Sequence, residues 1–194
     1  MYRLFFIVLV PFLTARASQV YSSFIYPVIQ TAADETSGAE YFRKHSTHSF
    51  VGALGYGFEI HSAAYLGLRY EYWVSDRKYD LLNVSYNHRL SYQTLGVEAG
   101  YHFNHPRVWW ALLVGAHYPW AVSSGNFSAA PSFQYQARAM LEIRVARSLW
   151  ILLETGWRWA NLGMLSDGDA LYIDGGGDFD LSGALVSFGV AFHF

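Results

Sequence analysis

The segment from Ser182 to Phe194 constrains the fold more than any other part of the chain, because its residues alternate with a period of two. One set of alternating positions is entirely apolar: Ala184, Val186, Phe188, Val190, Phe192 and Phe194. The intervening positions are small or polar, apart from Leu185. Successive side chains of a strand point to opposite faces, so this pattern predicts a β-strand with one strongly apolar face.

The same alternation recurs along the chain and predicts an all-β domain. It is clear at 50–60, 66–74, 95–103, 108–120, 133–145 and 149–159. Short turns at 61–63, 104–107 and 146–148 alternate with longer segments, which is typical of up-and-down strands. If Phe194 lies at the short-turn end, one more strand must precede residue 50. The segment 19–30 supplies it, with Pro27 near its outer end, so we expect eight antiparallel strands.

Strand register can be predicted across the short turns. Pairing across 61–63 sets Gly55 opposite Arg69 and Ala53 opposite Glu71, so small and charged residues share a face. Pairing across 146–148 sets Glu142 near Leu152. Pairing across the four-residue turn at 104–107 also keeps the small and polar positions of the two strands on one face. The three hairpins therefore predict one consistent polar face.

Alternation alone leaves open which face is inside, because a soluble lipocalin-like barrel encloses its aromatic residues. Here the apolar face carries far more large side chains than an eight-stranded interior can hold. Aromatic residues gather at both ends of the strands, with Leu112, Val114, Leu141 and Ile151 between them. A lipid-facing apolar band with two aromatic girdles is the pattern of a transmembrane barrel. Closure also pairs the backbone groups that a bilayer leaves without water.

With this pattern, the segment 18–194 resembles the small eight-stranded barrels of Gram-negative outer membranes, typified by the transmembrane domain of OmpA and by OmpX. The resemblance implies a bacterial outer-membrane location. It implies an assembly signal in the C-terminal strand, to which the aromatic residues Phe192 and Phe194 belong. It also implies as partners the lipid and lipopolysaccharide of that membrane and the barrel assembly machinery. No motif ties the chain to a particular subfamily.

The N-terminus has the features of a secretory signal peptide. Arg3 supplies positive charge, residues 4–13 form an apolar stretch, and Ala15-Arg16-Ala17 matches a cleavage site. We predict a cleaved signal peptide at 1–17 and one barrel domain at 18–194. No other apolar run is long enough for a transmembrane helix. The absence of cysteine excludes disulfides and a lipoprotein anchor, and a net charge of −2 gives no sign of nucleic-acid binding.

Charged residues on the polar face are the first candidate functional set. Buried charges need partners, and an eight-stranded barrel leaves little free lumen, so we expect these residues to form ion pairs that plug the barrel. The alternative is that they line or gate a narrow solute pore. The set comprises Glu59, Arg69, Glu71, Glu98, Arg138, Glu142, Arg144, Glu154 and Arg158.

A second hypothesis is an outer-leaflet acyl hydrolase. Ser46 and His48 continue the outward register of the strand from Phe50, and the predicted pairing sets Asp76 opposite His48. A hydroxyl, an imidazole and a carboxylate are the groups of a catalytic triad. Lipid A deacylases of the PagL type use a lipid-facing His-x-Ser pair. In this chain the order is reversed and their flanking motif is missing, so a role without catalysis is favoured.

The remaining candidates lie in the external loops, which are expected at about 31–47, 76–90, 123–132 and 160–181. The last loop carries carboxylates among glycines at spacings that calcium can use, at Asp167, Asp169, Asp174, Asp178 and Asp180. The EF-hand pattern is incomplete, so a solvated loop is favoured and no cofactor is expected. The sequence thus predicts an envelope-structural or surface-interaction protein that meets a surface partner through these loops.

Overall fold

A computed structural model describes most of the segment predicted to form the barrel. The described residues are 18–30, 42–61, 63–81, 84–123, 128–130, 132–165, 179–180 and 182–194. The predicted signal peptide at 1–17 lies outside them. No helix among the described residues has the length and hydropathy of a membrane span.

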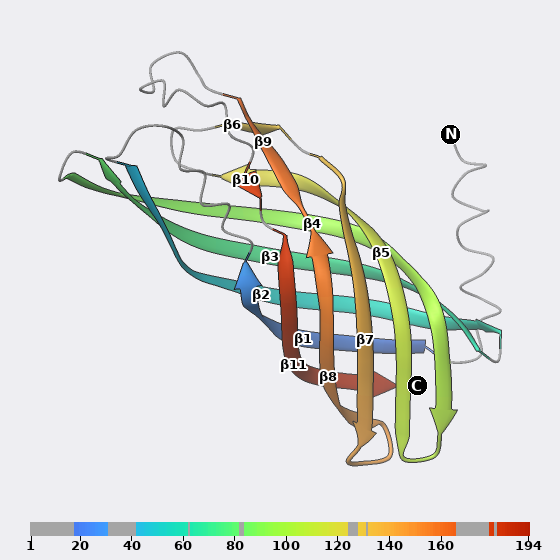
Figure 1. Ribbon diagram of the computed structural model, residues 1–194. Helices are drawn as coiled ribbons and strands as arrows, with labels where there is room; N and C mark the ends of the chain where they lie inside the picture. Colours follow the sequence, from blue (N-terminus) through green and yellow to red (C-terminus); the bar gives the residue numbers. More distant parts are fainter. Residues whose placement is uncertain are drawn as a thin grey trace, which may run out of the picture.

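Eight strands form a closed antiparallel barrel in the order β1-β11-β8-β7-β5-β4-β3-β2 (Figure 1). This confirms the predicted fold class. The barrel strands are β1 (Ser18–Gln30), β2 (Phe42–His61), β3 (Ala64–Leu81), β4 (Val84–His105), β5 (Val108–Ser123), β7 (Gln134–Arg144), β8 (Leu149–Trp159) and β11 (Gly183–His193). A separate three-stranded sheet joins β6 (Ser128–Ala130), β9 (Asn161–Leu165) and β10 (Phe179–Asp180).

The strand registers agree with the sequence predictions across all three short turns. Gly55 pairs with Arg69, and Ala53 with Glu71. Glu142 pairs with Leu152 across the 145–148 turn. The weakly patterned segment 19–30 does form the strand that closes the barrel, since β1 pairs with both β2 and β11.

The apolar face is on the outside, as the volume argument predicts. Leu112, Val114 and Val97 expose 54%, 63% and 53% of their surface, respectively, although they lie in the middle of their strands. Inward positions hold charged groups such as Arg69 and Glu71, both 0% exposed. This is the reverse of a soluble barrel, so the outer surface is suited to hydrocarbon rather than to water.

Glycines on the inner face make room for large inward side chains. A Cβ added at Gly55 would lie 1.9 Å from Cζ of Tyr21, and one added at Gly57 would lie 2.0 Å from the Tyr65 hydroxyl oxygen. Real Cβ atoms do not approach other atoms so closely. The small residues that the sequence places on this face therefore leave space for tyrosine rings inside the barrel.

Within the predicted loop 76–90, residues 76–81 and 84–90 are paired strands. β3 and β4 stay paired without interruption from Ala64↔Tyr101 to Leu81↔Val84. The prediction failed because residues 76–89 carry charged and polar residues at both alternating sets of positions, so no apolar face marks the strands. Strand structure also extends into the other predicted loops, since β2 begins at Phe42 and β6, β9 and β10 lie within 123–132 and 160–181.

Candidate functional site

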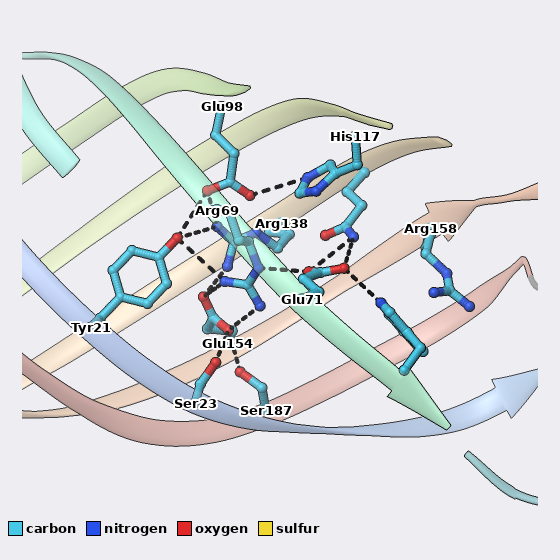
Figure 2. Close-up of polar contacts among 12 residues, drawn as sticks. Tyr21, Ser23, Arg69, Glu71, Glu98, His117, Arg138, Glu154, Arg158 and Ser187 are labelled. Atoms are coloured by element: carbon cyan, nitrogen blue, oxygen red, sulfur yellow. Dashed lines mark hydrogen bonds and ion pairs between the residues drawn. The ribbon is translucent and has the colours of Figure 1, made fainter. Parts of the chain in front are cut away.

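Five buried charged residues meet in the centre of the barrel (Figure 2). Arg69 donates from Nε to Glu71 Oε1 at 2.6 Å and from Nη1 and Nη2 to the two oxygens of Glu154 at 3.0 and 3.2 Å. Arg138 donates from Nη2 to Glu98 Oε2 at 2.5 Å and from Nη1 to Glu154 Oε1. We call these five residues the charged layer. Glu154 joins its two halves because it accepts from both arginines.

Strand alternation and closure bring these groups together. Arg69 and Glu71 occupy successive inward positions of β3, while Glu98, Arg138 and Glu154 come from β4, β7 and β8. Arg69 and Glu154 are 85 residues apart in sequence. All five residues are at most 5% exposed. In such a low-dielectric interior, every carboxylate requires a cationic or hydrogen-bonding partner, and each of the three has one.

Hydroxyl and amide groups complete the charged layer, and the sequence analysis did not identify them. Tyr21 donates to Glu98 at 3.1 Å, and Ser23 and Ser187 both donate to Glu154. Gln136 donates to both oxygens of Glu71, at 3.1 and 3.0 Å. Each of these residues lies on the inner face, so strand parity was the available signal. They carry no charge, so the expectation that buried charges need partners did not extend to them.

Arg158 lies beside the charged layer, against aromatic rings. Its guanidinium carbon is 3.4 Å from the ring centroid of Trp73, and its Nη1 donates to the Tyr92 hydroxyl at 2.7 Å. Trp73 and Tyr92 are themselves stacked, with centroids 5.8 Å apart. Trp73 also donates from Nε1 to Glu71 at 2.9 Å, which connects the aromatic pair to the charged layer. A cation over an indole face is favourable when it is shielded from water.

Glu142 and Glu59 pair with histidines near the short-turn end rather than with arginines. Glu142 contacts Nε2 of His193, and Glu59 Oε1 lies 3.7 Å from Nε2 of His102. Trp109 lies between the two histidines, with centroids 5.3 Å from His102 and 6.1 Å from His193. This second group of residues fills the lumen between the charged layer and the short turns.

Arg144 does not belong to the lumen set, contrary to the sequence prediction. It is exposed and donates to the backbone oxygens of Ala146 at 3.2 Å and Arg147 at 3.0 Å. The inward alternation of β7 ends at Glu142, because the chain then turns at 145–148. Arg144 therefore supports the turn instead of joining an ion pair inside the barrel.

The strand register separates two of the three residues of the hydrolase hypothesis. It shifts between Thr47 and Ser49, so Asp76 pairs with Thr47 and not with His48 as predicted. Ser46 pairs with Arg77. Residues 76 and 77 lie on opposite faces of β3, so Ser46 and Asp76 occupy opposite faces of the sheet. A one-residue bulge is enough to cause this, because the side-chain period of a strand is two.

The calcium hypothesis falls almost entirely outside the described residues. Asp167, Asp169, Asp174 and Asp178 lie in the segment 166–178, and Asp180 is placed only as a backbone partner of Asn161 in β10. Within the described part of the chain, no three His, Cys, Asp or Glu residues are grouped so that they could hold a metal ion. Calcium binding by the acidic loop stays an untested alternative to the solvated loop that the sequence favours.

Comparison with known proteins shows the fold and nothing more specific. No protein-family model matches the sequence, and no curated protein matches it. Among solved structures, the outer membrane protein OprG from Pseudomonas aeruginosa is similar with a TM-score of 0.67 and 10% identity, over 93% of this chain and 96% of that chain. Neisserial surface protein A is similar with a TM-score of 0.51 and 10% identity, over 92% and 99%. These matches confirm the expected eight-stranded barrel architecture and agree with the predicted outer-membrane location.

Proposed function

We propose that this chain is a bacterial outer-membrane barrel whose lumen is closed to ions. Its structural or surface-interaction role is then carried by the external loops, at the end of the barrel opposite the short turns. The observation that carries this proposal is the charged layer, in which Arg69, Arg138 and Glu154 bridge several strands. Their side chains extend across the lumen and are joined there by hydrogen bonds and ion pairs. The barrel then serves as a membrane anchor, and its function lies in what it presents outside.

The half of the lumen near the short turns supports a closed barrel. The cavity lined by Gln19, Glu59, Tyr65, Trp109 and His193 has a volume of only about 10 Å³. That is about the space of one water molecule. Gln19 donates to the Tyr65 hydroxyl at 3.2 Å, and Trp109 packs edge-on against Tyr65. A hydrated ion would have to displace several of these side chains.

Conductance in planar lipid bilayers tests the proposal. We expect the wild-type protein to give no single-channel steps, because the charged layer fills the lumen. The double variant Arg138→Ala/Glu154→Ala removes the side chains that join its two halves and should give measurable steps. Val114→Ala, on the lipid-facing side of the same barrel, is the matched control and should stay silent. Regular conductance of the wild-type protein would favour the narrow-pore alternative and overturn the plug.

A further inference from the structure

Two short turns lie side by side at one end of the barrel. One joins β4 to β5 at 104–107, and the other joins β7 to β8 at 145–148. Because β5 pairs with β7, the turns are neighbours, and the backbone N–H of Arg144 donates to the carbonyl oxygen of Arg107 at 3.0 Å. Figure 1 shows the two turns next to each other at the bottom of the picture. Residues that are distant in sequence therefore share one small part of the rim.

Three exposed arginines gather on these turns. Arg107 comes from the first turn, Arg144 ends β7, and Arg147 lies in the second turn. Besides its backbone bond to Arg107, Arg144 donates from Nη2 to the carbonyl oxygen of Arg147 at 3.0 Å. We call these three residues the basic rim. Arg144 is hydrogen-bonded to both other members, which keeps the three residues close together.

The basic rim has no counter-charge within the described part of the chain. Two carboxylates are described toward this end of the barrel, and each is already paired: Glu59 lies beside His102, and Glu142 contacts His193. No ion pair joins a described carboxylate to an arginine of the basic rim. The turns at 104–107 and 145–148 contain no Asp or Glu either. Positive charge is therefore left unbalanced on this part of the rim.

Exposed aromatic rings beside the basic rim indicate the level of the membrane surface. Tyr101, Phe103 and Trp110 lie on the outer face of β4 and β5, close to the 104–107 turn, and all three are exposed. Phe103 stacks on Trp110 with ring centroids 3.9 Å apart, and Tyr101 packs edge-on against Phe103 at 4.8 Å. Aromatic residues gather in this way where the hydrocarbon of a bilayer meets the headgroups. The basic rim lies just beyond them along the strands, at the depth of the lipid phosphates.

We propose that the basic rim binds the headgroup phosphate of an anionic phospholipid in the surrounding leaflet. A guanidinium group is planar and forms bidentate, charge-assisted hydrogen bonds with phosphate oxygens. Each basic residue near a membrane surface adds to the attraction for anionic lipid. The acyl chains of the same lipid meet apolar side chains, since Ile143 and Val145 are exposed beside the second turn. This site is at the end of the barrel opposite the external loops, so the inference goes beyond the proposed function.

Native mass spectrometry of the protein in maltoside micelles tests the inference. The micelles contain dioleoylphosphatidylglycerol or, for comparison, dioleoylphosphatidylcholine, which has the same acyl chains and a phosphate but no net charge. The critical variant is Arg107→Gln/Arg147→Gln, in which Arg144 is kept because it supports the turn. The matched control is Arg77→Gln/Lys78→Gln, which removes two charges from β3 at the other end of the barrel.

We expect the wild-type protein to bind phosphatidylglycerol about tenfold more tightly than phosphatidylcholine. The critical variant should lose most of this preference, because the two charges that it removes are the ones that attract the anionic headgroup. The control variant should change the affinity by less than about twofold, since its charges lie far from the basic rim along the barrel axis.

Equal affinity of the wild type for the two lipids would overturn the proposal. Equal weakening by the two double variants would overturn it as well, because it would show attraction to net charge without a defined site. Heat-modifiable migration on SDS gels checks that each variant forms the barrel, and the single variants Arg107→Gln and Arg147→Gln serve if the double variant does not. Lipid binding in micelles does not depend on whether the lumen conducts, so failure here is distinct from failure of the plugged-barrel proposal.

Discussion

Replacement of Glu154 by glutamine should destabilise the barrel more than any other single Glu→Gln change in the charged layer. The carboxylate accepts from Arg69 at 3.0 and 3.2 Å, and it also accepts from Arg138, Ser23 and Ser187. A glutamine has one oxygen and one NH2 group, so a donor would face other donors in either orientation. The change also leaves two buried guanidinium groups with one fewer negative charge. Breaking a buried ion pair on one side costs about 3–5 kcal/mol.

Urea unfolding in lipid vesicles, followed by tryptophan fluorescence, measures this cost. Glu59→Gln is the matched control, because the Glu59 side chain is 23% exposed and 3.7 Å from His102. Its loss should cost about 1 kcal/mol or less, as for a partly solvated pair. Removing both partners, in Arg138→Met/Glu154→Met, should cost less than the sum of the single changes. The reasoning is refuted if Glu154→Gln and Glu59→Gln lower the free energy of unfolding equally.

Two further predictions concern packing and the lipid-facing surface, and the same unfolding assay measures both. Gly55→Ala should destabilise the barrel by about 1–3 kcal/mol, because the new Cβ collides with the ring of Tyr21. Gly52→Ala, with no atom within 4 Å of its Cβ, should have little effect, and a similar cost at the two sites would contradict the packing argument. Leu112→Arg should cost about 2–4 kcal/mol at the bilayer midplane, against about 0–1 kcal/mol for Val145→Arg beside the short turn. Equal costs would mean that Leu112 does not face lipid.

The alternation of side chains between the two faces of each strand predicted the membrane-spanning part of the structure well. Residues such as Leu112 and Val114 were expected outside, Arg69 and Glu71 inside, and the structure places them there. The reason is that alternation is a local property of a strand, and a short turn fixes the register of the two strands it joins. Even the weak segment 19–30 followed from the placement of Phe194 at the short-turn end, which requires one more strand before residue 50.

The same reasoning failed where the chain leaves the bilayer. Residues 75–90 carry charged and polar residues at both sets of alternating positions, so their sequence marks no apolar face. The bulge at His48 is a one-residue shift, and it reverses the faces of Lys44 and Ser46. Nothing in the alternation of β2 alone signals this shift. Only the pairing with β3 reveals it.

The sequence by itself therefore determined the fold class, the lipid-facing surface and the three short hairpins, because all of these follow from side-chain period and turn length. The tertiary structure decided which buried charges meet. Arg69 reaches Glu154 across the lumen, Arg144 supports a turn, and Glu142 contacts His193. These contacts depend on barrel closure, which brings together residues on strands that are far apart in sequence. Local alternation identifies inward-facing residues, but it cannot identify their partners across the lumen.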